Sequence, residues 1–315
     1  MAGTAIRSFL HDARRWVTLT AMRGGLSLAR ILGDGGDLRF AHLLGRAAGL
    51  TPLRGRLAAN LKRAGIEPTP GTIDGYFRRF GDWLGWSAAV YNRGFVGSGI
   101  ADRFLFDESV SHLDSAVAKG RGVVLASAHE FCHEMGAAAI NRRLPVTAII
   151  RESGDRIREA MKAKWYQATG MTTLHRSRHS SLMADTMAYL RVLRSGQILA
   201  VTPDVIYPQD NGVTVETFGR PVTLSPGCVV LAMRSGAPLV CVWGEWVAGE
   251  RPGEERMKAI FDEPIEVPKT GDRDAVIRET MQRWCRRCEE HLRRHPQDWM
   301  FWLDKRWTKA LRSGA

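Results

Sequence analysis

The sequence predicts an α/β protein in which a mostly parallel central sheet is flanked by helices, preceded by a helical N-terminal segment. From residue 103 onward, short and continuously apolar runs alternate with stretches of helical periodicity. Strands that are apolar throughout are typical of a parallel sheet covered on both faces. The chain has 315 residues, of which 44% are hydrophobic and 25% charged, so it can form a large core.

Residues 1–70 are predicted to form a basic helical segment. Up to Arg79 the chain carries 13 Lys and Arg against five Asp and Glu, and its apolar residues recur at roughly helical spacing. A basic amphipathic helix lying on a membrane surface fits this pattern. A helix packed on its own domain, with arginine stems over the apolar face, fits it equally well. We expect this segment to associate with a membrane.

The charge and the cysteines restrict the partners and the compartment. A net charge of +12 favours anionic partners, namely nucleic acid, anionic lipid or an acidic carrier protein. No run approaches the roughly 18 uncharged apolar residues of a spanning helix. Arg14, Arg15 and Arg23 interrupt the apolar region that a signal peptide would need. Five cysteines without an export signal indicate free thiols in a reducing compartment.

The elements follow one another in a regular order. A turn at 65–71 precedes a helix over 72–97, whose aromatic stripe we expect to pack in the core. Further helices are predicted over 107–119, 130–143, 155–169, 180–194 and 225–235. Strands are predicted over 122–128, 146–150, 171–174, 197–202 and 239–246.

The segment from Ala126 to Gly136 carries the candidate chemistry and has two interpretations. In the first, His129, Glu130 and His133 form the H-E-x-x-H motif of a zinc hydrolase, in which two histidines on one helix face bind the metal. That motif should lie inside a helix, whereas His129 directly follows a predicted strand.

In the second interpretation, His129 and Glu134 form an H-x4-E pair. His129 follows the carboxyl end of a strand, where ligand sites of open α/β sheets lie. A histidine there can serve as a general base on a hydroxyl group. A carboxylate on its other ring nitrogen would fix the tautomer and stabilise the imidazolium. The two interpretations assign opposite importance to Glu130 and Glu134.

Several segments match a known family in order and spacing over residues 75–307. They are the H-x4-E pair, Ile149-Ile150-Arg151, Val201-Thr-Pro-Asp204, Thr217-Phe-Gly-Arg220, Ser225-Pro-Gly227, Ala237-Pro-Leu-Val-Cys241, and His295-Pro-Gln-Asp-Trp299 through Trp307. On these segments the chain resembles the late, or secondary, lipid A acyltransferases of the lysophospholipid acyltransferase superfamily.

The resemblance implies an acyltransferase domain over residues 71–315. Such an enzyme would move a fatty acyl chain from an acyl carrier protein or coenzyme A thioester to a hydroxyl or amine of a lipid or glycolipid. His129 would be the base and Glu134 its orienting acid, while Arg151, Asp204 and Arg220 would bind substrate. The resemblance implies no metal, no cofactor and no nucleic acid. It also implies a peripheral enzyme at the cytoplasmic face of the inner membrane, against an anionic surface.

Two C-terminal features remain. Cys285, Cys288, His291 and His295 follow the order of metal ligands, but ten residues of one helix span about 15 Å, which is too far for a single zinc ion. A group of three tryptophans could lie at a membrane interface or pack over the sheet, and both alternatives stay open. They are Trp299, Trp302 and Trp307.

Overall fold

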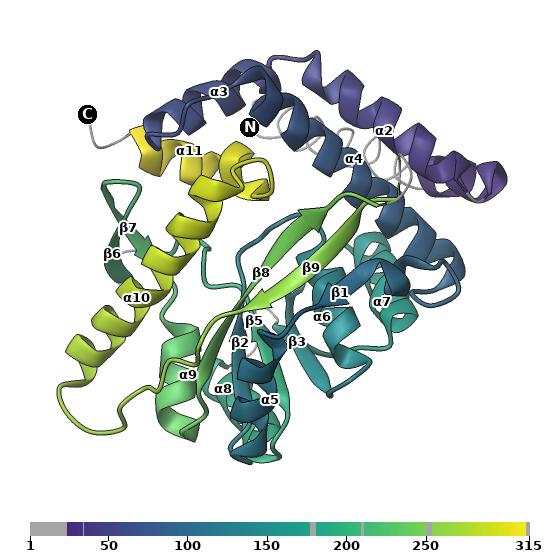
Figure 1. Cartoon of the computed structure of the whole chain (residues 1–315). Helices are drawn as coiled ribbons and strands as arrows, with labels where there is room; N and C mark the ends of the chain where they lie inside the picture. The colour runs from purple at the N-terminus through teal and green to yellow at the C-terminus, as the bar shows by residue number, and fades with distance from the viewer. Residues whose placement is uncertain (1–23, 34, 177–180, 209–210, 250–253, 313–315) are drawn as a thin grey trace, which may run out of the picture.

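The computed structural model describes residues 24–33, 35–176, 181–208, 211–249 and 254–312. Its centre is a seven-stranded sheet (Figure 1). In spatial order the strands are β1 (Phe104–Phe106), β9 (Arg256–Phe261), β8 (Leu239–Val247), β2 (Val123–Ala126), β5 (Ile198–Val201), β3 (Val146–Arg151) and β4 (Thr172–Arg176). The predicted α/β class with a mostly parallel sheet is therefore confirmed.

The sheet departs from the prediction at one edge. β9 pairs antiparallel with β8 and parallel with β1, whereas the remaining neighbours run parallel. Neither β1 nor β9 was predicted, because β1 has only three residues and β9 alternates between buried and half-buried positions instead of being apolar throughout. An alternating strand of this kind is typical of an antiparallel pair with one exposed face.

Helices cover both faces of the sheet, because successive strand residues point to opposite sides. One buried cluster joins Val123 and Leu125 to α5 (Val110–Ala118), α6 (His133–Asn141) and α7 (Arg156–Thr169). The other joins Val124 and Ala126 to α8 (Leu182–Arg194), α9 (Gly227–Ser235) and α10 (Arg273–Arg294). All the helices predicted after residue 103 are thus present, with ends shifted by a few residues.

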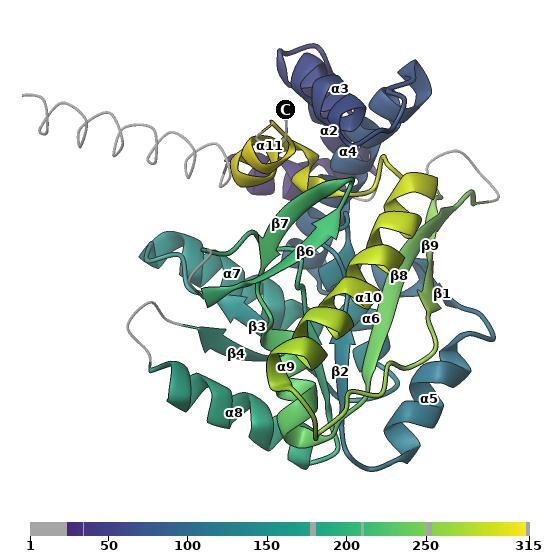
Figure 2. The same ribbon diagram turned by 90° about the vertical axis from the view of Figure 1, so that its left-hand side faces the viewer.

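A separate hairpin stands beside α10 (Figure 2). It consists of β6 (Val213–Thr217) and β7 (Arg220–Leu224), and neither strand was predicted. Phe218 and Gly219 have φ angles of 51° and 67°, the left-handed conformation that two-residue hairpin turns require. Glu289 of α10 accepts a hydrogen bond from the backbone N–H of Phe218 at 2.7 Å, so the turn is held against the helix.

Three N-terminal helices lie above the sheet in Figure 1, namely α2 (Gly36–Gly49), α3 (Leu53–Arg63) and α4 (Pro70–Arg93). Leu57 and Leu61 of α3 are fully buried in the same core cluster as the sheet. Close packing of α2 on α4 depends on glycine, since a Cβ at Gly45 would stand 2.4 Å from the carbonyl oxygen of Phe77. Residues 1–23 of the predicted basic segment lie outside the described residues. None of the helices in the described ranges is long and apolar enough to cross a membrane.

The C-terminal tryptophans settle one of the open alternatives. Trp299, Trp302 and Trp307 are at most 2% exposed and contact one another through their ring edges. They lie around the short 3-10 turn Met300–Leu303 and helix α11 (Lys305–Arg312). They therefore pack in the core, and the membrane-interface alternative was wrong.

Candidate active site

His129 lies in the loop between β2 and α6. Cys132, the residue before α6, has a φ of 68°, so the chain turns sharply before the helix begins at His133. The C-terminal segment fixes this loop from one side. The carbonyl oxygen of His129 accepts a hydrogen bond from the N–H of Met300 at 2.9 Å, and the N–H of Phe131 donates to the carbonyl oxygen of Asp298 at 2.8 Å.

The carboxylate that contacts His129 belongs to Asp204. Asp204 Oδ1 lies 2.6 Å from His129 Nδ1, and Oδ2 accepts a hydrogen bond from the backbone N–H of His129 at 2.8 Å. A carboxylate can only accept, so Nδ1 carries the proton and Nε2 is left as the basic nitrogen. Nε2 lies 3.3 Å from Thr202 Oγ1. The ring of Phe301 stacks on the imidazole at 4.2 Å and holds its plane.

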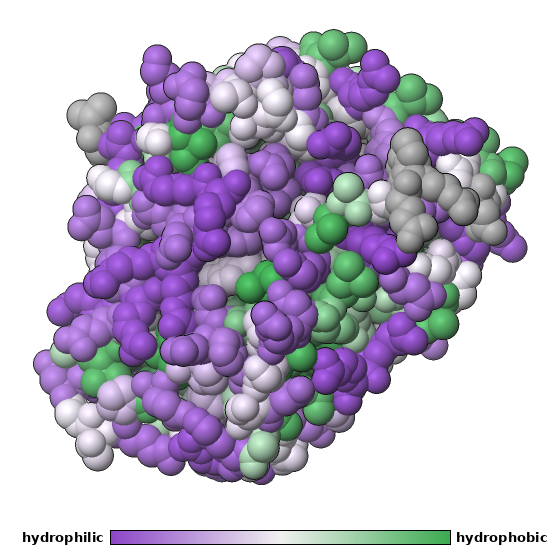
Figure 3. All heavy atoms as spheres, viewed as in Figure 1, coloured by the Kyte–Doolittle hydropathy of each residue, from purple (hydrophilic) through white to green (hydrophobic). Residues whose placement is uncertain are grey.

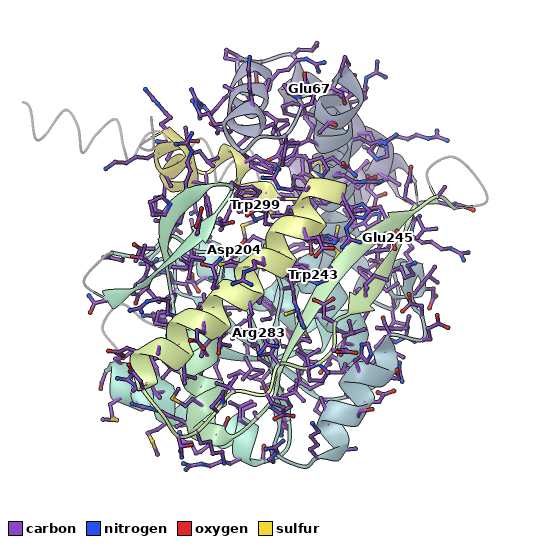
Figure 4. All side chains as sticks on the ribbon, turned by 60° about the vertical axis from the view of Figure 1, so that its left-hand side comes forward. Glu67, Asp204, Trp243, Glu245, Arg283 and Trp299 are labelled. Atoms are coloured by element: carbon purple, nitrogen blue, oxygen red, sulfur yellow. The ribbon has the colours of Figure 1, made fainter. Side chains whose placement is uncertain are left out.

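Asp204 is only 1% exposed, and its remaining lone pairs also have partners. The indole N–H of Trp299 donates to Asp204 Oδ2 at 2.8 Å, and that of Trp307 donates to the Asp204 carbonyl oxygen at 2.8 Å. Figure 4 shows Asp204 and Trp299 next to each other near the hairpin and α10. A buried carboxylate with this many donors is stable in its charged form.

The two partners shift each other's pKa. Burial alone would lower the pKa of His129, but the charge of Asp204 and its hydrogen bond outweigh burial, so the pKa is raised. For Asp204, burial would raise the pKa, and the charge and hydrogen bonds of His129 together with Trp299 lower it instead. The geometry thus combines an ionised acid with a histidine of increased basicity.

Glu134 does not make the contact with His129 that its spacing predicted. It lies in the first turn of α6, where its Oε1 accepts a hydrogen bond from the hydroxyl of Tyr166 at 2.7 Å. The prediction placed His129 at the start of a helix over 130–143, so that Glu134 one helical turn on could reach back to it. Because α6 begins only at His133, the two residues are not one helical turn apart. The carboxylate at His129 Nδ1 is therefore that of Asp204, and Glu134 lines the space in front of His129.

That space is a cleft of about 1060 Å³, including its open mouth. The end of β3, the end of β5 and helices α6 and α7 form its walls. Its polar lining residues are Ser127, His129, His133, Glu134, Arg151, Lys162, Tyr166 and Thr202. Two cations, Arg151 and Lys162, thus lie within reach of an anionic substrate.

The three residues predicted to bind substrate differ in whether they line the cleft. Arg151 ends β3, is exposed and lines the cleft, as a substrate-binding residue would. Asp204 is buried behind His129 and is not exposed to the cleft. Arg220 begins β7 directly after the hairpin turn and is not among the described residues that line the cleft.

A second, apolar pocket with a cavity volume of about 40 Å³ adjoins the cleft. The two share Ser127, His133, Ala137 and Ala200 in their walls. Deeper in, the pocket is lined by one buried acid, Glu130, and otherwise by apolar residues, namely Phe104, Leu125, Phe131, Gly136, Ile140, Val242, Trp243, Gly244, Met257 and Ala259. This pocket continues from the cleft into the core between β8 and α6, and its lining suits a hydrocarbon.

The family model for bacterial lipid A biosynthesis acyltransferases matches residues 73–309, which include all of these site residues. The chain belongs to this family. A search of curated proteins finds no match to the chain. Membership of an acyltransferase family that acts in lipid A biosynthesis indicates acyl transfer to a lipid acceptor.

The arrangement of the acyltransferase site does not suit the zinc interpretation. Glu130 is 2% exposed, and its carboxylate pairs with His291 Nε2 at 2.6 Å instead of facing the cleft. His129 precedes α6, so His129 and His133 do not share a helix face. Across the described ranges, no three of the side chains that bind metals are grouped so as to hold an ion. Glu130 instead connects the loop between β2 and α6 to His291 of α10.

Sequence reasoning missed four residues of the site. Thr202 and Trp299 lie within segments that resemble the family, so their position was known but not their role. Phe301 lies in the same C-terminal segment, and nothing in its spacing indicated the stack on His129. Tyr166 is one of several aromatic residues on a predicted helix, and only the fold brings it to Glu134.

Proposed function

We propose that this protein transfers a fatty acyl chain from an acyl thioester to a hydroxyl or amine group of a lipid or glycolipid acceptor, with His129 as the general base. One observation carries the proposal. His129 is held from behind by the buried carboxylate of Asp204 while it lines an open cleft. A histidine supported in this way can accept a proton from an acceptor in the cleft.

The reaction follows from this geometry. His129 Nε2 takes the proton of the acceptor hydroxyl, whose oxygen attacks the thioester carbonyl carbon. A C–O bond forms and the C–S bond breaks as the tetrahedral intermediate collapses. The imidazolium then returns the proton to the departing sulfur, giving an ester and a free thiol. Asp204 stabilises the imidazolium between the two transfers.

In this mechanism Asp204 takes the orienting role that the sequence assigned to Glu134. Glu134, held by Tyr166, is placed to contact a substrate together with Arg151 and Lys162 at the cleft. Arg220 does not line the cleft in the described part of the chain. We therefore assign it no contact with the substrate at His129. No metal ion or cofactor is needed for these steps.

The apolar pocket supports an acyl substrate. It joins the cleft at His133 and Ala137 and leads toward the core, so a thioester carbonyl near His129 would direct its hydrocarbon tail to the pocket, whose side chains would move apart to admit it. Burial of such a tail contributes about 0.8 kcal/mol per methylene group. The donor is proposed to be an acyl carrier protein or coenzyme A thioester.

The N-terminal surface supports a peripheral position on the cytoplasmic face of the inner membrane. Ile31, Leu43 and Leu50 are 81%, 63% and 90% exposed, and exposed arginines lie between them along the chain. Figure 3 shows hydrophobic atoms at the upper right edge of the molecule, where Figure 1 places α2. Apolar side chains among cations suit an anionic lipid surface.

The test is acyl transfer followed by mass spectrometry. Purified protein is mixed with acyl carrier protein and coenzyme A thioesters and a bacterial lipid extract, with and without a chelator. We expect a newly acylated lipid that His129→Ala fails to form and that the chelator does not affect. His112→Ala is the matched control, because the Nδ1–H of His112 donates to the Phe261 carbonyl oxygen at 2.9 Å and His112 does not line the cleft.

Two results would contradict the proposal. Acyl transfer that survives in His129→Ala would remove the base from the mechanism. Hydrolysis that depends on a chelatable metal and on Glu130, without any acylated product, would favour the zinc interpretation instead.

A further inference from the structure

Two polar side chains line the passage between the cleft and the apolar pocket. Four residues line both cavities and thus form this passage, which we call the neck, namely Ser127, His133, Ala137 and Ala200. The two alanines are small, whereas the serine hydroxyl and the imidazole form hydrogen bonds. An acyl chain that extends from a thioester at His129 into the apolar pocket must pass through the neck.

The imidazole of His133 has a fixed tautomer. Its Nδ1 lies 2.8 Å from the carbonyl oxygen of Glu130, and a carbonyl oxygen can only accept, so Nδ1 carries the proton. Burial lowers the pKa of His133 although the charge of Glu134 opposes this, so the ring is neutral at pH 7. Nε2 is therefore a hydrogen-bond acceptor, and no donor within the described part of the chain is bonded to it.

The loop that carries this acceptor is fixed at its other end. The Glu130 side chain is 2% exposed, and its carboxylate contacts His291 Nε2 at 2.6 Å and accepts from the N–H of Gly244 at 3.2 Å. The carbonyl oxygen that orients His133 is thus held in place before a substrate binds. A polar group that is already in place discriminates between ligands without the cost of ordering it.

Ser127 supplies the second polar group of the neck. Its N–H donates to the carbonyl oxygen of Val201 at 3.1 Å, which fixes the residue directly after β2. Its hydroxyl makes no hydrogen bond to any of the described residues. An alcohol in the neck can donate to His133 Nε2 and accept from the Ser127 hydroxyl, so it would satisfy both groups.

The neck lies close to the proposed base, since the ring centres of His129 and His133 are 5.1 Å apart. With C–C bonds of about 1.5 Å, the third carbon of an acyl chain lies about 2.5 Å from its carbonyl carbon. A hydroxyl on the second or third carbon therefore comes beside His133 when the thioester carbonyl is beside His129. A saturated chain would place a methylene group there and leave both polar groups without a partner, which is unfavourable.

We propose that the neck selects an acyl donor that carries a hydroxyl group on its second or third carbon, with His133 Nε2 accepting the hydrogen bond of that hydroxyl. This inference rests on the proposed acyl transfer and adds the chemical class of the donor. The hydroxyl takes no part in the reaction, so the bonds that form and break are those already given.

The first test is a competition between donors. The protein receives equal amounts of decanoyl and 3-hydroxydecanoyl thioesters of one carrier, with a bacterial lipid extract as acceptor, and mass spectrometry gives the ratio of products. We expect at least about a tenfold preference for the hydroxylated donor, because a site built around a hydroxyl rejects the analogue that lacks it. The 2-hydroxydecanoyl thioester should also win over decanoyl if the second carbon is the selected position. The 10-hydroxydecanoyl thioester should lose to it, because its hydroxyl lies beyond the neck.

Variants of the neck identify the groups responsible. His133→Leu removes the acceptor and should reduce the preference to about twofold or less, and Ser127→Ala should reduce it in part. His133→Asn restores a polar group and should retain part of the preference. His175→Leu is the matched control, because His175 is an exposed histidine of β4 that lines neither cavity. The ratio of two products of one enzyme does not change merely because a variant loses part of its folded population.

The second test needs no turnover. Calorimetry compares 3-hydroxydecanoic acid with decanoic acid as ligands of the unaltered protein and of His133→Leu. We expect the hydroxylated acid to bind at least about fivefold more tightly to the unaltered protein, as one added hydrogen bond allows. The two acids should bind equally to His133→Leu.

The outcomes separate this inference from the proposed function. Equal use of saturated and hydroxylated donors, or a preference that survives both His133→Leu and Ser127→Ala, would overturn the inference. If either occurs while acyl transfer still depends on His129, the proposed function stands. If no thioester yields a product, the proposed function fails, and the calorimetric comparison decides whether the neck selects a hydroxylated chain.

Discussion

Replacement of Asp204 by asparagine tests the central feature of the site. Asp204 Oδ2 accepts from two fixed donors, the backbone N–H of His129 and the indole N–H of Trp299. An asparagine would keep its carbonyl oxygen toward those two donors. Its NH₂ group would then face His129 Nδ1, which must act as an acceptor. The imidazole proton would move to Nε2, and the base would be lost.

The expected magnitude follows from this change of tautomer. General acid–base catalysis contributes about 10²–10⁴ in rate. We expect kcat to fall about 10³-fold, which is about 4 kcal/mol in the activation barrier, with little change in KM because Asp204 does not reach the cleft. The lost charge-assisted hydrogen bond should lower the free energy of unfolding by about 1.5–3 kcal/mol.

The pH profile gives an independent check. The pKa of His129 is raised above 6.5 by Asp204 despite its burial, so the acid limb of kcat/KM should lie above that pH. In Asp204→Asn the residual activity should show its acid limb at lower pH, since the carboxylate charge that raises the pKa is gone.

The assay is single-turnover acyl transfer from an acyl thioester, followed at several pH values alongside thermal unfolding. Glu134→Gln is the matched control, since it removes one carboxylate charge from the same site without touching His129 Nδ1. We expect it to change KM more than kcat. A near-normal kcat in Asp204→Asn together with a large loss in Glu134→Gln would refute the assignment and restore the orienting role of Glu134.

Three further predictions concern the loop, the pH dependence and the pocket. His291→Ala leaves the buried carboxylate of Glu130 without its ion-pair partner and should lower the free energy of unfolding in urea by about 3–5 kcal/mol. The control Glu266→Ala breaks an exposed ion pair and should lower it by at most about 1 kcal/mol. Equal losses in the two variants would contradict this prediction. Burial raises the pKa of Asp298 to about 8 although Arg79 opposes it, so its contribution to stability is greatest below pH 4 and is lost as the pH rises through 8. Asp298→Asn should therefore flatten the fall in Tm between pH 5 and about 9, and an unchanged slope would be evidence against the shift. Gly136→Leu should narrow the apolar pocket, and a Cβ at this position has room because its nearest neighbour, Phe104, is 3.8 Å away. In a competition assay the variant should prefer decanoyl over palmitoyl thioesters. An unaltered preference would exclude the pocket as the acyl site.

The predictable part of the fold is the part governed by local pattern. β2 and β3 are mostly apolar runs, and the helices α5 and α7, which precede β2 and follow β3, have clear periodicity and end near Gly120 and Gly170. β1 is too short to carry a pattern. β6 and β7 depend on a left-handed turn at Phe218, a residue type that rarely adopts one, so sequence rules gave no hairpin signal there.

The candidate site likewise has residues that local sequence patterns predict and residues that only the fold brings together. His129 and Arg151 could be placed at strand ends because each directly follows an apolar run. The partner of His129 could not be predicted from local sequence, because the contact with Asp204 joins residues 75 positions apart. Local spacing favoured Glu134 instead, and that inference depended on a helix that begins three residues later than predicted. The left-handed backbone conformation of Cys132 separates His129 from the helix α6 that carries Glu134.

Trp299 of the C-terminal segment explains why the proposed orienting acid can come from the buried turn after β5. A carboxylate that is 1% exposed keeps its charge only if donors replace the water it loses. Two of those donors, the backbone N–H and ring of His129, come from the loop after β2, and a third comes from Trp299. Glu134 stands at the open cleft, where water can solvate it, and it needs no such layer. The buried indole of Trp299 therefore helps to keep the charge on Asp204, and so the C-terminal segment supports the proposed catalytic pair although none of its tryptophans lines the cleft in the described part of the chain.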